Sequence, residues 1–329
     1  MRLFILGAGV SKSYGGSLAD DLLTDAINQC KARGRNVRMI SGIDKILSYA
    51  FPDFEPSSGK YPHIEEVLSL LDTWMDFNSQ IQDKPQFSDF QISEVRRWII
   101  RIVADSLSTI SSRRNIKQTS SISKFALTLK PKDVVITFNW DLGLERAIDE
   151  YTELDWDYSF PSKGKEIALL KAHGSIDWYQ TEDIYRVPPK DKEPLDPKVG
   201  RISFIKWWDP SRGVGRPREI APYIIPPTYF KSFQSGEIRS IWTNMFVALS
   251  RATSIIILGY SLPIQDLQAR ITLRSAIEQN PKQRAAGASG IVTVINPRVK
   301  TKKTFRQLGF NFRFVQEKFK NINFSALKK

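Results

Sequence analysis

Two short stretches carry side chains that could do acid–base chemistry on a ligand. Residues 138–141 (FNWD) place the Asn139 amide and the Asp141 carboxylate together, and residues 172–175 (AHGS) hold His173, one of only two histidines. An unperturbed imidazole has a pKa of about 6.5, which makes His173 a base suited to neutral pH. The alternatives are structural: Asn139 and Asp141 can cap a following helix, and His173 can be a hydrogen-bonded core residue.

A glycine turn near the start of the chain is a third candidate. In residues 1–16 (MRLFILGAGVSKSYGG) an apolar run stops at Gly7, Ala8 and Gly9, and the chain can enter a helix after Ser11. A strand, turn and helix of this kind direct backbone N–H groups at one point, which suits the pyrophosphate of a dinucleotide. Lys12 replaces the third glycine of the usual fingerprint, so an ordinary tight turn is the alternative.

All of these candidates follow apolar runs that predict strands. The runs cover residues 1–6, 133–137, 167–171, 254–259 and 291–295, with a weaker one at 312–315. Gly259 ends the fourth run, Ser261 follows it and Asn296 follows the fifth, although Ser261 and Asn296 can also simply close turns. Helical patterns alternate with the runs, so we predict an α/β fold: a Rossmann-like, doubly wound parallel sheet whose strand ends converge on one edge.

The intervening segments predict two insertions in a single domain that covers residues 1–329. Residues 35–130 show helical patterns and no convincing strand, and we interpret them as a helical insertion. Residues 177–227 are rich in proline, charge and aromatic side chains. We interpret them as a loop-rich insertion with short strands at 202–206 and 223–225.

Composition narrows the class of protein. One cysteine and two histidines argue against an internal disulfide or a zinc site, so we expect no metal and no zinc module. The net charge of +13 favours an acidic or polyanionic partner, such as nucleic acid, although basic clusters such as 96–97, 113–114 and 300–303 can also be solvated faces. No membrane-length apolar run and no secretory signal is present, so we expect a cytoplasmic protein without membrane contact.

The order of these segments resembles the sirtuin family. Residues 7–11 (GAGVS) are similar to its GAGxS loop, 138–141 to its QNID segment, 172–175 to its HG segment and 259–262 (GYSL) to its GTSL segment, and Asn296 is similar to its late asparagine. The paired CxxC zinc module and the GxPDFR continuation of that family are missing. The closer resemblance is therefore to zinc-free sirtuin-like domains of bacterial antiphage systems.

This resemblance implies a Rossmann-like NAD⁺ hydrolase that releases nicotinamide and ADP-ribose. It implies Asn139 and His173 as catalytic residues, with Asp141 holding the nicotinamide carboxamide. The implied NAD-binding set is Gly7, Ala8, Gly9, Ser11, Asp141, Gly259, Ser261 and Asn296. It also implies activation by a partner, such as a HerA-like ATPase or a nucleic-acid-sensing protein.

Two other functions compete with this one. The chain could be a non-catalytic nucleotide- or DNA-binding subunit, and an NAD-dependent protein deacylase is disfavoured by the missing zinc module. The apolar and basic helical faces of residues 35–130 further suggest a homo-oligomer, unless those faces pack on the protein's own sheet.

Overall fold

The computed structural model describes residues 1–78, 86–112, 114–158, 160, 166–180, 202–204, 222–225, 236–287 and 290–328. The chain forms two compact units. We call Met1–Gly16, Ile110–Ser175 and Phe233–Lys329 the sheet unit, and Ser17–Thr109 and Ile176–Ser232 the helical unit. Most of the loop-rich insertion predicted at 177–227 lies outside the described residues.

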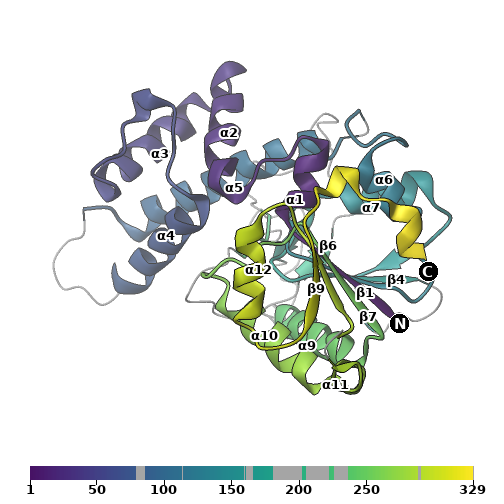
Figure 1. Cartoon of the computed structure of the whole chain (residues 1–329). Helices are drawn as coiled ribbons and strands as arrows, with labels where there is room; N and C mark the ends of the chain where they lie inside the picture. Colours follow the sequence, from purple (N-terminus) through teal and green to yellow (C-terminus); the bar gives the residue numbers. More distant parts are fainter. Residues whose placement is uncertain are drawn as a thin grey trace, which may run out of the picture. The chain divides into compact units, whose positions relative to one another are not determined.

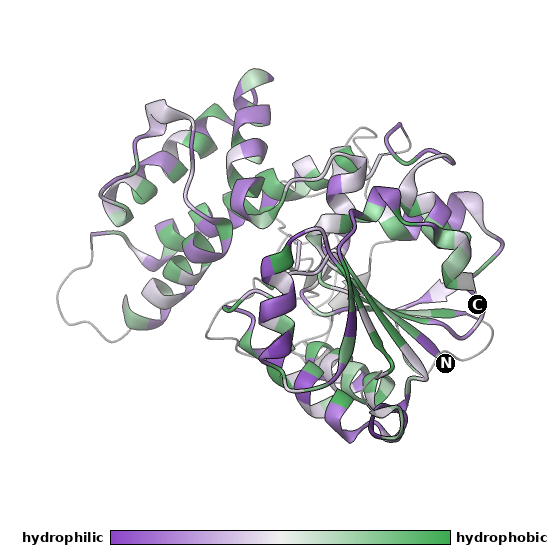
Figure 2. Cartoon of the chain, in the orientation of Figure 1, coloured by the Kyte–Doolittle hydropathy of each residue, from purple (hydrophilic) through white to green (hydrophobic). Residues whose placement is uncertain are grey.

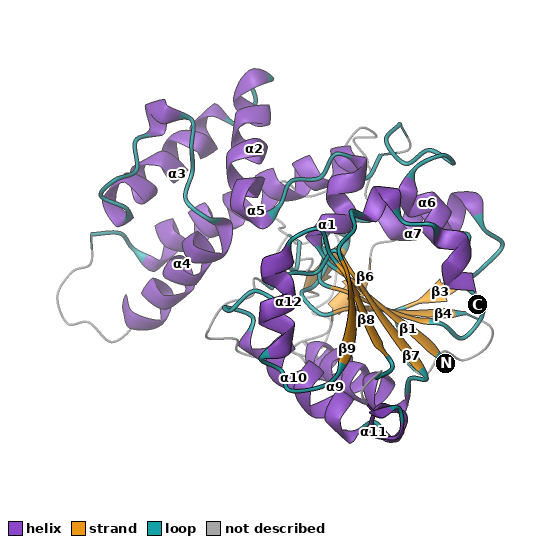
Figure 3. Ribbon diagram, in the orientation of Figure 1, coloured by secondary structure: helices purple, strands orange, loops and turns teal. Residues whose placement is uncertain are grey.

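The sheet unit is built on seven parallel strands in the order β3-β4-β2-β1-β7-β8-β9 (Figure 3). The strands are β1 (Arg2–Leu6), β2 (Val134–Thr137), β3 (Trp156–Asp157), β4 (Ile167–Lys171), β7 (Ser254–Leu258), β8 (Val292–Ile295) and β9 (Phe312–Val315). From central β1 the chain first builds one side of the sheet, where β4 lies between β2 and the edge strand β3, and then adds β7, β8 and β9 outward on the other side. This is the predicted doubly wound, Rossmann-like topology, and that prediction is confirmed.

The strand register aligns the carboxyl ends at one edge. Leu6 lies opposite both Thr137 and Leu258, Thr137 lies opposite Lys171, and Leu258 lies opposite Ile295. The strand order reverses between β1 and β7. In open α/β sheets this reversal, at the carboxyl ends, is where ligands bind.

Helices cover both faces of the sheet. On one face lie α6 (Ser121–Ala126), α7 (Gly143–Tyr151) and two C-terminal 3-10 helices (Phe319–Asn321 and Phe324–Lys328), and Phe4 of β1 meets Phe125 of α6 edge-on at 5.2 Å. On the other lie α9 (Gly236–Arg251), α10 (Leu267–Gln279) and α11 (Pro281–Ala285), while α12 (Val299–Arg306) joins β8 to β9 (Figure 1). The strands between these layers are predominantly apolar, as burial on both faces requires (Figure 2).

The helical unit contains α2 (Ala19–Ala32), α3 (Val37–Ala50), α4 (Ile64–Asn78) and α5 (Asp89–Ile110), the last of which ends at the boundary of the sheet unit. Ser106 of α5 donates a hydrogen bond to Gln29 of α2 at 3.2 Å. The unit begins at Ser17, whereas the predicted insertion begins at residue 35. Helix α2 therefore belongs to the same unit as the other three helices. None of the described helices has the length and apolar character needed to span a membrane.

An antiparallel pair of short strands, β5 (Trp178–Gln180) and β6 (Ile202–Phe204), also belongs to the helical unit. The described part of the strand predicted at 202–206 is therefore extended. Of the strand predicted at 223–225, the structure has only an isolated bridge residue, Ile224, and the Tyr223 N–H donates to the Trp178 carbonyl at 2.7 Å.

Candidate functional site

The glycine turn after β1 lies directly against the loop after β7. The Gly9 N–H donates to the Gly259 carbonyl at 3.0 Å. A Cβ atom on Gly9 would lie 2.9 Å from the Gly259 Cα, and one on Gly7 would lie 2.5 Å from the Tyr260 Cα. Gly259 itself has φ +61°. Glycine is therefore required because two backbones touch where the strand order reverses.

The first helix starts within the glycine turn, which corrects the expectation that it starts after Ser11. Gly7 is extended and ends the strand, and α1 (Ala8–Ser11) begins at the next residue. A 3-10 helix, Lys12–Tyr14, follows. Ala8 and Gly9 are partly exposed, whereas Gly7 and Val10 on either side of them are buried.

Asp141 ties the loop after β2 to this first helix. Its buried carboxylate accepts hydrogen bonds from the Ser11 hydroxyl at 2.5 Å, from the Tyr14 hydroxyl at 2.5 Å and from the Gly143 N–H at 2.9 Å. Burial and then the negative charge of Asp141 raise the pKa of Tyr14 well above its ordinary value. Asp141 thus binds an N–H group at the start of α7, which agrees with the alternative that it caps the following helix. It also joins two of the predicted site segments.

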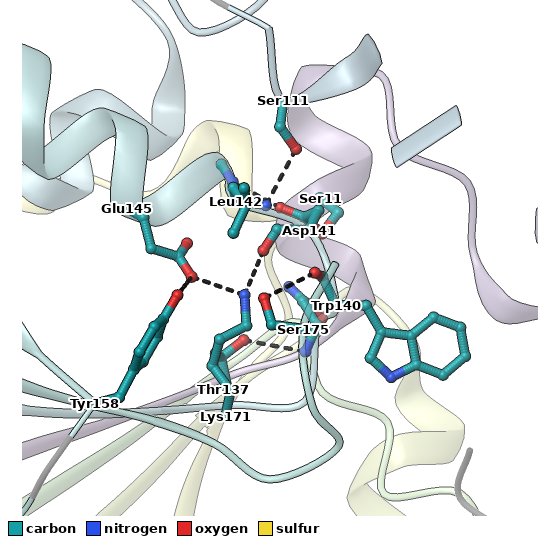
Figure 4. Close-up of polar contacts among 12 residues, drawn as sticks. Ser11, Ser111, Thr137, Trp140, Asp141, Leu142, Glu145, Tyr158, Lys171 and Ser175 are labelled. Atoms are coloured by element: carbon teal, nitrogen blue, oxygen red, sulfur yellow. Dashed lines mark hydrogen bonds and ion pairs between the residues drawn. The ribbon is translucent and has the colours of Figure 1, made fainter. Parts of the chain in front are cut away.

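Lys171, the last residue of β4, binds both the same loop and the helix that follows it. Its ammonium group donates to the Asp141 carbonyl at 2.6 Å and pairs with Glu145 of α7 at 2.7 Å. The Tyr158 hydroxyl donates to the same Glu145 carboxylate at 3.2 Å (Figure 4). The Lys171 side chain is 0% exposed, so its charge is compensated entirely within the protein.

Asn139 holds the end of β2 against the glycine turn. Its side-chain amide donates to the Gly7 carbonyl at 3.1 Å, and its backbone N–H donates to the Thr137 hydroxyl at 3.1 Å. The residue is only half-buried, unlike its neighbours Phe138 and Trp140. The structure therefore brings Asn139 and the glycine turn together, as the resemblance implies.

His173 is buried beside a second carboxylate. Its Nε2 lies 3.1 Å from Asp266 Oδ2, which also accepts a hydrogen bond from the Tyr260 hydroxyl at 2.9 Å. The imidazole meets the Phe138 ring edge-on at 5.0 Å. His173 follows β4 and Tyr260 follows β7, so Asp266 joins strand ends from the two halves of the sheet.

The remaining predicted residues lie at the same edge. The Asn296 amide donates to the Tyr260 carbonyl at 3.3 Å, and its oxygen accepts from the Arg298 N–H at 2.9 Å, so the residue closes a turn and steadies the β7 loop. Ser261 is exposed. The next residue, Leu262, is buried yet has φ +55°, an uncommon conformation for a bulky side chain.

The residues missed by sequence reasoning are Tyr14, Glu145, Lys171, Tyr260 and Asp266. Two of them left a readable signal. Lys171 ends an otherwise apolar strand, where a buried cation needs a carboxylate partner. Asp266 precedes a helical pattern as a typical N-cap. No group of three or more His, Cys, Asp or Glu side chains in the described part of the chain is arranged to hold a metal ion.

No family model matches the sequence, and no curated protein matches it. Among solved structures the chain is similar to one described as "Structural Basis for the Mechanism and Regulation of Sir2 Enzymes", with 13% identity, coverage of 97% of this chain and 88% of that chain, and a TM-score of 0.42. It is also similar to a "Sir2-p53 peptide-NAD+" structure, with 14% identity, the same coverages and a TM-score of 0.40. The fold and the site described above come from the chain itself and not from these likenesses.

Proposed function

We propose that the chain is an NAD⁺ hydrolase whose substrate binds at the carboxyl edge of the sheet. The observation that carries the proposal is the contact of Gly9 with Gly259 where the strand order reverses. The pyrophosphate of the dinucleotide would lie beside Ala8 and Gly9, the two partly exposed residues of the turn. The resemblance of residues 7–11, 138–141 and 172–175 to sirtuin segments supports NAD⁺ as the dinucleotide.

The reaction breaks the bond between the ribose C1′ and the nicotinamide ring nitrogen. The bonding electron pair goes to that nitrogen, which is already cationic in NAD⁺, so the leaving group needs no proton. Water forms the new bond to C1′ and loses a proton. In this proposal Asn139 orients the water and His173 accepts its proton.

Asp141 has room for one further role in this scheme. A carboxylate offers about four acceptor positions, and the described protein donors occupy three of them. The fourth can accept an N–H of the nicotinamide carboxamide, which is the contact that the sirtuin resemblance implies. The Ser11 and Tyr14 hydroxyls would then position the carboxylate.

The biological role that we attach to this activity is NAD⁺ depletion in a bacterial antiphage system. The resemblance supports a cytoplasmic effector that a HerA-like ATPase or another nucleic-acid-sensing partner activates. The net charge of +13 is compatible with an acidic partner or nucleic acid. We attach homo-oligomerisation to residues 35–130, whose cluster at 113–114 is described only at the exposed Arg114.

The test measures nicotinamide release from NAD⁺ by the purified protein, alone and with duplex DNA and the product of the neighbouring gene. We expect His173→Ala to lower turnover about 10²- to 10⁴-fold, the range for loss of a general base. The matched control is His63→Ala, which removes the other, partly exposed histidine. Equal turnover by wild type and His173→Ala under activating conditions would contradict the assignment.

Asn139→Ala separates rate from binding at the same site. An interaction made chiefly in the transition state lowers kcat and leaves affinity nearly unchanged, so we expect at least about a tenfold loss of turnover with similar NAD⁺ binding by calorimetry. If binding disappears in step with turnover, Asn139 binds the substrate and has no separate catalytic role.

Two further arms distinguish the competing functions. Nicotinamide release that requires an acetyl-lysine peptide would identify a deacylase. Calorimetric binding of NAD⁺ with no release under any of these conditions would identify a non-catalytic nucleotide-binding subunit.

A further inference from the structure

Asp266 is a buried carboxylate that contacts a backbone N–H and two side chains. Its Oδ1 accepts the Ala269 N–H at 3.4 Å and so caps α10. Its Oδ2 accepts the Tyr260 hydroxyl at 2.9 Å and lies 3.1 Å from His173 Nε2. Asp266 is 0% exposed and His173 is 3% exposed, so the contact between them is shielded from solvent.

This geometry constrains where the histidine carries its proton. An ionised carboxylate only accepts hydrogen bonds, so the contact with Asp266 Oδ2 requires a proton on Nε2. A neutral imidazole has one N–H and one nitrogen with a free lone pair. With the proton on Nε2, the basic lone pair of His173 is on Nδ1.

Aromatic packing restricts rotation of the imidazole away from this arrangement. The Phe138 ring stacks on the Tyr260 ring at 4.2 Å and meets the His173 ring edge-on at 5.0 Å. Trp242 of α9 lies 6.2 Å from the imidazole, centroid to centroid. The Asp266 carboxylate, the Tyr260 hydroxyl and the His173 imidazole are thus held in fixed positions relative to one another.

We infer that Asp266 is the positioning residue that holds His173 as the Nε2–H tautomer and assigns the role of base to Nδ1. The inference deepens the proposed function, because it names the nitrogen that accepts the proton of the attacking water. Asp266 itself touches no reacting atom. It acts through His173, as a carboxylate does when it fixes the tautomer of a catalytic histidine.

Nuclear magnetic resonance can test the tautomer directly because the chain has only two histidines. The full-length protein is labelled with ¹⁵N-histidine, and long-range ¹⁵N–¹H correlations report which ring nitrogens carry protons. The His63→Gln variant shows which signals in the spectrum belong to His173. We expect His173 to show protonated Nε2 and unprotonated Nδ1 near neutral pH. The Nδ1–H tautomer, or an imidazolium with both nitrogens protonated, would overturn the inference.

Asp266→Asn tests whether the carboxylate sets this state. Asparagine has the same shape and its oxygen can still cap α10, but its NH₂ group is a donor where the carboxylate was an acceptor. With that donor facing Nε2, we expect the His173 proton to move to Nδ1. An unchanged His173 spectrum in the folded variant would overturn the role of Asp266. If this variant does not fold, the wild-type spectrum still decides the tautomer.

Tyr260→Phe is the matched control. It removes a donor to the same carboxylate and keeps the ring that stacks on Phe138. The Nε2 contact of His173 remains, so we expect the wild-type tautomer. Loss of that tautomer in Tyr260→Phe would show that Asp266 does not fix it by direct contact, and would overturn the inference.

Turnover links the inference to the reaction while keeping the two separable. We expect Asp266→Asn to lower kcat for nicotinamide release about 10²- to 10⁴-fold with a nearly unchanged KM. The expected spectrum in a protein that never cleaves NAD⁺ would support the orientation and contradict the hydrolase proposal. NAD⁺ cleavage by an enzyme with His173 protonated on Nδ1 would support the hydrolase proposal and contradict the inferred orientation of His173.

Discussion

The two edges of the sheet are stabilised in different ways. At the amino edge one side chain binds several segments: the Arg2 guanidinium pairs with Asp133 and donates to the carbonyls of Thr128 at 2.9 Å and Leu327 at 2.7 Å. At the carboxyl edge two separate buried carboxylates, Asp141 and Asp266, each bind donors from more than one element of the fold.

This difference indicates where function can reside. Arg2 joins the start of the chain to its end, because its guanidinium binds Asp133 and two backbone carbonyls. The carboxyl edge instead orients an amide and an imidazole, Asn139 and His173, near a turn in which Ala8 and Gly9 are partly exposed. We therefore expect amino-edge substitutions to change only stability, and carboxyl-edge substitutions to change ligand chemistry as well.

The largest effect on folding is expected from Lys171→Met at the carboxyl edge. The substitution leaves the buried Glu145 carboxylate without its cation, which typically costs about 3–5 kcal/mol. The free energy of unfolding is measured by urea denaturation.

A double variant checks the cause of that loss. Lys171→Met with Glu145→Gln removes both charges, so most of the lost stability should return. The Asp141 carbonyl still lacks its donor in the double variant. We therefore expect NAD⁺ binding to be weaker than wild type in both the single and the double variant. Wild-type stability and wild-type affinity in the double variant would show that Lys171 has no role in positioning the loop.

Arg2→Met should cost somewhat less, about 3 kcal/mol, because the Arg2 side chain is 14% exposed and part of its charge is solvated. Denaturation measures the loss, and calorimetry on the folded fraction measures NAD⁺ affinity. We expect that affinity to equal the wild-type value. A weaker affinity per folded molecule would break the distinction between the two edges.

Much of this carboxyl edge was predictable from sequence because strand ends are local signals. Apolar, β-branched runs that stop at Gly7, Phe138 and Gly259 mark buried parallel strands, and parallel strands place their ends at one edge. The two-residue β3 was missed because so short an edge strand has no periodicity of its own. The start of α1 was misplaced because the extended backbone of Gly7 was not foreseeable from composition.

The polar network was harder to predict because its partners are distant in sequence. Ser11 and Asp141 are 130 residues apart, yet their side chains lie 2.5 Å apart. Asp266 looks like an ordinary helix cap, and only the fold brings it to His173. A single sequence predicts which residues end the strands, but the hydrogen bonds among those ends depend on the order in which the strands pair.

A smaller effect, about 1 kcal/mol at neutral pH, is expected from Tyr14→Phe, which deletes the hydrogen bond to Asp141. The pKa of Tyr14 is raised in the folded state, first by burial and then by Asp141. Its contribution to stability is therefore complete below the unfolded value of about 10 and is lost as the pH rises through the folded pKa.

The measurement is the free energy of unfolding of wild type and Tyr14→Phe across the alkaline range. The wild-type free energy should decline above the unfolded pKa of tyrosine, and this part of the decline should be absent in the variant. Parallel curves for the two proteins would contradict the raised pKa of Tyr14.

The smallest effect compares one surface charge at each edge. Lys12 is exposed and follows α1 beside the glycine turn, whereas Lys132 is exposed in the loop that leads into β2 at the amino edge. Reversing Lys12 to Glu places a negative charge near the proposed pyrophosphate site, so NAD⁺ affinity should fall about three- to tenfold at low salt, and less at high salt because the charges are screened. Lys132→Glu makes the same change in net charge far from the ligand, and its affinity should match wild type at every salt concentration. Calorimetric titrations of both variants at two ionic strengths decide the matter: equal losses would mean that NAD⁺ responds only to the overall charge of the protein, and no loss in either would place the pyrophosphate away from the glycine turn.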